Sequence, residues 1–106
     1  MVVLRMPETA THVIPYSVDG NYLDLNDGEI IVNLARKERD DAVHLDFCWD
    51  YLGGLIMGTA GARKYAAQVD IPSREYTEEE TEDGVILKPV PFDVDKCTLT
   101  LWDVED

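Results

Sequence analysis

The residue types that most often bind metals or act as nucleophiles are scarce in this chain of 106 residues. Its two histidines are His12 and His44, and its two cysteines are Cys48 and Cys97. No His-x-x-x-His or Cys-x-x-Cys spacing occurs, whereas a transition-metal site needs three or four such ligands. A helix would stack His44 and Cys48 on one face, but a strand would hold them about 13 Å apart. We therefore expect no metal, no cofactor and no paired cysteine and histidine.

The carboxylates and serines of the chain do not form a recognisable catalytic or calcium-binding motif either. The chain has 22 aspartates and glutamates, but hydrolysis by paired carboxylates requires two of them at a defined separation in a cleft. Neither Ser17 nor Ser73 lies in a Gly-x-Ser-x-Gly motif. The turn-rich run 19–28 fails the EF-hand pattern, because Leu23 stands where an oxygen ligand is needed. We assign no catalytic, cofactor-binding or metal-binding residue, and a small hydrolase or metal-dependent enzyme is the least supported of three hypotheses.

The net charge of the chain is −13, and residues 75–106 account for −9 of it. A field of this sign repels nucleic acid and anionic membranes, so we expect no direct binding to either. No run of about 18 apolar residues is present to cross a membrane, and the first residues do not have the pattern of a signal peptide. The expected location is the cytoplasm, with reduced thiols, or a virion if the chain is phage-derived.

The densest negative charge lies in the run 77–84, which reads Thr-Glu-Glu-Glu-Thr-Glu-Asp-Gly. Because like charges this close together stay in water, the run is predicted to be the exposed acidic tip of a hairpin. The charge could serve solubility alone or contact a basic partner, and the sequence leaves both open. The candidate contact residues of this tip are Glu78, Glu79, Glu80, Glu82 and Asp83.

The clearest structural signal is the alternation of apolar and polar residues in the run 43–51. A period of two directs one set of side chains to the core of a sheet and places Cys48 on the other face. A competing helix would be capped by Asp40 or Asp41 and end before Gly53. Enrichment in Val, Phe, Trp and Tyr favours the strand. The inward set is then Val43, Leu45, Phe47 and Trp49.

Similar alternation recurs between turn signals such as Asp27-Gly28. We predict a mainly β fold, an antiparallel sandwich or a partly open barrel of six to eight short strands, with one short helix near 36–52 as an option. The chain fits a single domain, 1–106, with an N-terminal arm at 1–12. The glycine-rich run 53–61 is expected to be a loop. The expected strands lie near 13–18, 22–25, 29–34, 43–51, 64–71, 74–77, 85–88 and 97–102.

Trp102 is the large aromatic side chain that fits the predicted core least well. In the last strand it falls in phase with the threonines, whereas Cys97, Leu99 and Leu101 share the inward phase. A tryptophan on the outer face indicates either a subunit contact or burial under a loop or helix. The sequence does not distinguish these two roles.

Two functional hypotheses are better supported by the sequence than an enzymatic function. The first is a non-enzymatic structural or assembly domain that forms a homo-oligomer or is an accessory subunit of a larger particle, such as a phage virion, with Trp102 as a contact residue. The second is an acidic inhibitor that mimics nucleic acid and binds a basic DNA- or RNA-binding protein. Because duplex DNA carries one charge per about 1.7 Å, thirteen charges correspond to about 22 Å of duplex. Size, β content and the lack of a catalytic motif favour the first.

Overall fold

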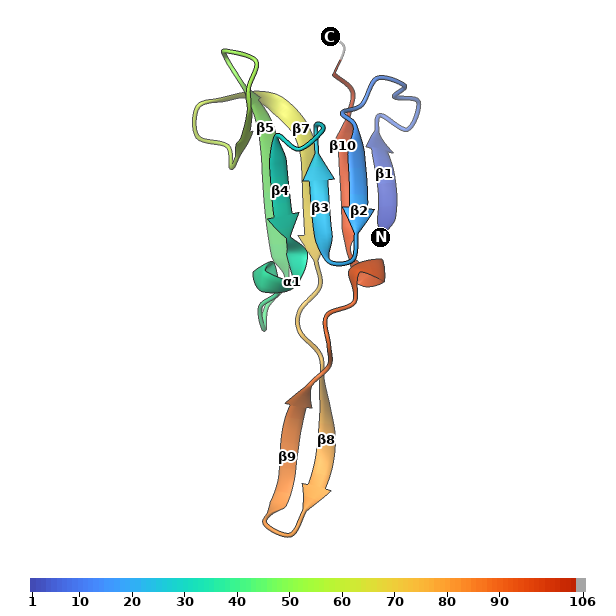
Figure 1. The fold of residues 1–106 in the computed structure, drawn as a ribbon, viewed down its shortest axis with the longest axis vertical. Helices are drawn as coiled ribbons and strands as arrows, with labels where there is room; N and C mark the ends of the chain where they lie inside the picture. The colour runs from blue at the N-terminus through green and yellow to red at the C-terminus, as the bar shows by residue number, and fades with distance from the viewer. Residues whose placement is uncertain (105–106) are drawn as a thin grey trace.

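A computed structural model describes residues 1–104 and shows a β-sandwich with a long hairpin projecting from one end (Figure 1). The described residues form ten strands, a single turn of α-helix and a short 3-10 helix. The predicted mainly β fold is confirmed. The helical turn α1 spans Leu34–Lys37, and the 3-10 helix η1 spans Val94–Lys96.

The sandwich consists of a five-stranded and a three-stranded sheet that lie one in front of the other (Figure 1). All neighbouring strands are antiparallel except β1 and β10, which are parallel. The large sheet has the order β1 (Val2–Met6), β10 (Thr98–Trp102), β7 (Ala62–Ile71), β5 (Val43–Asp50) and β6 (Leu55–Met57). The small sheet has the order β2 (Tyr16–Asp19), β3 (Tyr22–Leu25) and β4 (Ile30–Asn33). The projecting hairpin is β8 (Tyr76–Thr81) and β9 (Gly84–Pro89).

The core lies between the two sheets, and no polar or charged side chain among residues 1–104 is buried in it. The period of two directs Leu23 and Leu25 of β3 inward, and Leu99 and Leu101 of β10 likewise. Phe47 of β5 belongs to the same cluster and is fully buried. The charged side chains of the described sandwich therefore lie on outer faces, at edges or in loops.

The alternating run 43–51 forms the strand β5, so the strand prediction is confirmed and the competing helix is wrong. The α-helix of the structure, α1, overlaps the predicted range 36–52 only at its last two residues. Val43, Leu45 and Trp49 pack against the core cluster around the buried Phe47, as their phase predicts.

Cys48 lies outside the core cluster, as its phase predicts, but its side chain is only 1% exposed. The pairing of β5 with β7 shifts register between Phe47 and Cys48. Cys48 lines a small pocket together with Thr59, Ala62 and Tyr65, from the segment that leads into β7 and from its first residues. Facing away from the core therefore does not leave this thiol in solvent.

The predicted count of six to eight strands is too low, and the two additional strands are the edges of the large sheet. β1 occupies residues predicted as an N-terminal arm, and Val2 pairs in parallel with Thr98. β6 lies in the glycine-rich run expected to be a loop. All five residues of β1 are exposed, so one-sided burial imposes no alternation on its sequence.

The position of Phe47 in the core predicts a large loss of stability when its ring is removed. Replacing this fully buried ring by alanine should lower the free energy of unfolding by about 3–5 kcal/mol, because lost burial and a cavity both contribute. Ile31, which is 60% exposed on β4, is the matched control, and Ile31→Thr should change stability by no more than about 0.5 kcal/mol. Urea unfolding of both variants measures this, and equal effects would contradict the described core.

Candidate interaction surfaces

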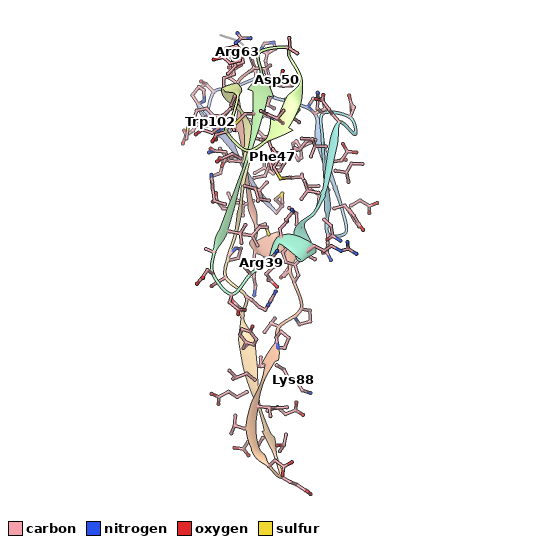
Figure 2. All side chains as sticks on the ribbon, turned by 90° about the vertical axis from the view of Figure 1, so that its left-hand side faces the viewer. Arg39, Phe47, Asp50, Arg63, Lys88 and Trp102 are labelled. Carbon is pink, nitrogen blue, oxygen red and sulfur yellow. The ribbon has the colours of Figure 1, made fainter. Side chains whose placement is uncertain are left out.

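The hairpin arm, defined here as residues 76–89, projects from one end of the sandwich (Figure 1, Figure 2). It contributes to a length of 61 Å, against 27 and 21 Å in the other two directions. All twelve residues of β8 and β9 are exposed. A hairpin forms where it is predicted, but its turn is shorter than the run 77–84. Glu82 and Asp83 lie in the turn, whereas Glu78, Glu79 and Glu80 lie on β8 itself.

The two faces of the hairpin arm differ in character. Residues directly opposite each other in an antiparallel pair share a face, and Glu78 pairs with Leu87 while Glu80 pairs with Val85. We call this set the Leu87 face. The opposite face contains Ile86 and a salt bridge between Glu79 and Lys88; its pairs are Glu79 with Ile86 and Thr77 with Lys88.

The Leu87 face combines uncompensated charge with exposed apolar surface. Glu78 and Glu80 have no cationic partner within residues 1–104, in contrast to Glu79 on the other face. Leu87 is 63% exposed and Val85 is 59% exposed. The carboxylates of this face keep it hydrated, while its exposed Val and Leu side chains provide apolar surface that a partner could bury.

The base of the hairpin arm is fixed to the sandwich by polar contacts. The Arg74 guanidinium lies 3.3 Å from Asp40, and the Tyr76 hydroxyl donates to the same carboxylate at 2.6 Å. Lys96 donates to Glu75 at 2.9 Å from the 3-10 helix on the other side. The arm is therefore anchored at its base and is surrounded by solvent beyond it.

Trp102 lies on the outer face of the large sheet, on the side predicted from its phase. Its ring stacks on Tyr65, with centroids 5.4 Å apart and planes at 27°. Its indole N–H donates to Gln68 Oε1 at 2.8 Å. These contacts are made to β7 within the same chain, and the structure does not bring Trp102 together with the acidic residues of the hairpin arm, which lie at the far end (Figure 2). A subunit contact at Trp102 stays a prediction.

A hydrogen-bonded network continues from Gln68 across the outer face. Gln68 Nε2 donates to Asp46 at 2.9 Å, and Asp46 also lies 2.8 Å from His44 Nε2. The other ring nitrogen of His44, Nδ1, lies 2.6 Å from Asp70. A protonated imidazole can donate to both carboxylates at once, whereas a neutral one leaves a carboxylate facing a ring lone pair. The hydrogen bond to Asp70, more than that to Asp46, therefore raises the pKa of His44.

This network was not predicted from the sequence. The sequence does show that His44 and Asp46 are two residues apart on β5, as Gln68 and Asp70 are on β7, so each pair shares one face of its strand. The register that pairs His44 with Asp70 and Asp46 with Gln68 brings them together. The hydrogen bond from Gln68, followed by that from His44, lowers the pKa of Asp46. The network thus links the side chains of three adjacent strands, β5, β7 and β10, by hydrogen bonds on the outer face of the large sheet.

The two thiols of the chain are held inside the folded protein. Cys48 and Cys97 are both unbridged and buried. Burial raises the pKa of Cys48, and burial raises the pKa of Cys97 to about 11. Within residues 1–104, no group of three or more histidines, cysteines, aspartates or glutamates is arranged to hold a metal ion.

Comparisons with protein-family models, with curated proteins and with solved structures found no match. No helix in the described part of the chain has the length and apolar character needed to cross a membrane. The surfaces of this molecule must therefore be interpreted from their own geometry.

The His44 network predicts a pH dependence. Because its pKa is raised in the folded state, the stabilisation by His44 is fully present below its unfolded pKa of about 6.5 and is lost as pH rises through the folded-state pKa. NMR titration should place the His44 pKa above 6.5, and Asp70→Asn should move it back towards that value. A His44 pKa at or below 6.5 in the unmodified protein would contradict the network.

The buried thiols predict slow modification. In the folded protein near neutral pH, a thiol-specific reagent should react with neither Cys48 nor Cys97 on the timescale of an exposed cysteine, because both are protonated and shielded. In denaturant, both thiols should react rapidly. Colour development with an aromatic disulfide measures this, and one thiol reacting at once in the native protein would show that the packing over Cys48 or Cys97 is wrong.

Proposed function

We propose that this protein is a non-enzymatic assembly domain that joins protein subunits through its hairpin arm, as a homo-oligomer or as an accessory subunit of a larger particle. The observation that carries the proposal is an exposed two-stranded projection on which acidic and apolar residues share one face. The β-sandwich then serves as the rigid body from which the projection extends.

The energetics of the arm favour a partner. A two-stranded hairpin is marginally stable in water when nothing packs against it, and no residue of β8 or β9 is buried. Fully burying a Val or Leu side chain stabilises a complex by about 1.5–3 kcal/mol. Val85 and Leu87 therefore contribute little burial energy in an isolated molecule, and they would contribute more when buried in a contact between subunits.

Nucleic-acid mimicry is the second candidate, and the placement of Glu78, Glu79 and Glu80 along a strand favours it more than a compact acidic tip would. Six strand residues span about 20 Å, a length over which duplex DNA carries about 12 charges. The six residues of β8 carry three, namely Glu78, Glu79 and Glu80, and β9 beside it carries Val85, Ile86 and Leu87. The arrangement suits a protein partner better than a basic nucleic-acid groove.

Removal of the hairpin arm tests the assembly function. The backbone N–H of Val90 donates to the carbonyl of Glu75 at 2.8 Å, so a short Gly-Ser linker can close the chain at that point. The unmodified protein should show a mass in light scattering that rises with concentration, whereas the armless variant should stay monomeric. Both should unfold at nearly the same urea concentration, because no buried residue is removed.

Hydrogen exchange gives the matching local readout. Amides of β8 and β9 should exchange quickly in dilute protein and become protected as concentration rises, while those of β7 and β10 stay protected throughout. An unmodified protein that remains a strict monomer, with an arm equally unprotected at all concentrations, would count decisively against the proposal.

A further inference from the structure

The outer edge of β9 is open to another strand. β8 and β9 form a sheet of only two strands, and within residues 1–104 neither of them pairs with a strand of the sandwich (Figure 1). All six residues of β9 are exposed. A free strand edge carries N–H and C=O groups that can pair with a further strand. This edge is therefore a third surface of the hairpin arm, besides its two faces.

The register of the hairpin shows which backbone groups lie on the edge. The N–H of Val90 donates to the carbonyl of Glu75 at 2.8 Å, so these two residues form a hydrogen-bonded pair that continues the ladder of β8 and β9. Hydrogen-bonded and non-hydrogen-bonded pairs alternate along an antiparallel ladder. Val85 and Leu87 therefore occupy non-hydrogen-bonded positions, and their N–H and C=O groups point away from β8.

Pro89 limits what this edge can pair with. It occupies the next position of the same kind, and proline has no N–H to donate. The donors of the edge are therefore the N–H groups of Val85 and Leu87, each beside its own carbonyl. A matching strand must present two donors and two acceptors at the same two-residue spacing. β9 of a second copy presents this set when it runs in the antiparallel direction.

We propose that β9 pairs with β9 of a second copy, so that two hairpin arms form one four-stranded antiparallel sheet. This inference rests on the proposed assembly function and identifies the partner of the arm as a second copy of this chain. Val85 of each copy lies opposite Leu87 of the other, and all of their edge N–H and C=O groups are then paired. A register centred on Leu87 would instead place the Val85 carbonyl opposite Pro89, without a donor.

The proposed register joins the apolar parts of the two arms. Because opposite residues share a face, Val85 and Leu87 of both copies form one aliphatic cluster on the joined Leu87 faces. The two copies of Ile86 meet on the other face at a non-hydrogen-bonded position, where Cα atoms lie about 4.5 Å apart. A β-sheet needs three or more strands with an apolar face to be stable without further support. The pairing therefore supplies what the isolated arm lacks.

The distribution of carboxylates favours β9 over β8 as the shared edge. β8 carries Glu78, Glu79 and Glu80, whereas β9 carries no acidic residue and one cation, Lys88. Pairing two β8 strands would bring both sets of carboxylates onto strands about 4.8 Å apart, where like charges are destabilising. Pairing two β9 strands separates the β8 strands by three strand spacings, about 14 Å, which exceeds the Debye length of about 10 Å at 0.1 M salt.

Disulfide cross-linking tests the register. Ile86→Cys should form a disulfide between two copies, because directly opposite Cα atoms lie within the range of about 4.4–6.8 Å that a disulfide spans. Glu80→Cys, an equally solvent-exposed position on β8, is the matched control and should form little. The native Cys48 and Cys97 are buried and do not compete. After oxidation and alkylation of the remaining thiols, a non-reducing denaturing gel should show Ile86→Cys at twice the 12.0 kDa of one chain.

Proline substitution tests the edge hydrogen bonds. Leu87→Pro removes an N–H that points away from β8, so the hairpin keeps its own ladder, as it does at Pro89. This variant should be monomeric in light scattering at concentrations where the unmodified protein has twice the mass of one chain. Glu78→Pro, directly opposite on β8, removes the equivalent N–H from the other edge and is the matched control. It should assemble as the unmodified protein does.

Failure of this inference is distinguishable from failure of the assembly function. If the armless variant is monomeric while Leu87→Pro still assembles, or if assembled Ile86→Cys forms no more disulfide than Glu80→Cys, the inference is wrong while arm-dependent assembly stands. A mass that grows beyond two copies would indicate pairing of β8 with β9 in an open series, and it would overturn the inference in the same way. An unmodified protein that stays monomeric at every concentration overturns both proposals.

Discussion

The structure depends on one-sided burial in two facing sheets. Leu23 and Leu25 on the small sheet and Leu99 and Leu101 on the large sheet are fully buried in one apolar cluster, and none of the described polar side chains is buried with them. A core this small and dry has no place for a charge, because an unpaired buried charge is very costly. The carboxylates of a chain with net charge −13 must therefore lie on outer faces, in loops or on a projection, and the projection takes the densest group.

The same constraint explains how much of the fold is legible in the sequence. Strands that bury one face show a period of two, and this pattern located the inner strands β3, β4, β5, β7 and β10. The other predicted regions overlap the exposed strands β2, β8 and β9, but the region 74–77 shares only Tyr76 and Thr77 with β8. The two unpredicted strands, β1 and β6, are the edges of the large sheet. β1 has exposed residues on both faces, and β6 has three residues within a glycine-rich run, so neither acquires the alternation that reveals an inner strand.

The hydrogen-bonded network around His44 could not be predicted from the sequence, for a different reason. Alternation places His44 and Asp46 outward on β5, but their partners are set by the register between β5 and β7, and Asp70 is 26 residues away from His44. A slip of one residue would reverse every face, and the irregularity between Phe47 and Cys48 shifts the pairing further along the same strands. Single-strand patterns therefore predict which residues face outward and leave open which of them meet.

The uneven distribution of charge along the molecule bears on the assembly proposed above. A net charge of −13 opposes side-by-side packing of identical copies, because like surfaces then meet along their whole length. Charges separated by more than the Debye length, about 10 Å at 0.1 M salt, are largely screened from each other. In a molecule 61 Å long, the carboxylates of the hairpin arm lie well beyond that distance from the opposite end of the sandwich, so they act there only weakly. A contact through the arm, as proposed above, is therefore opposed least where it keeps the acidic strands of the two arms apart, so the distribution of charge matters more than its total.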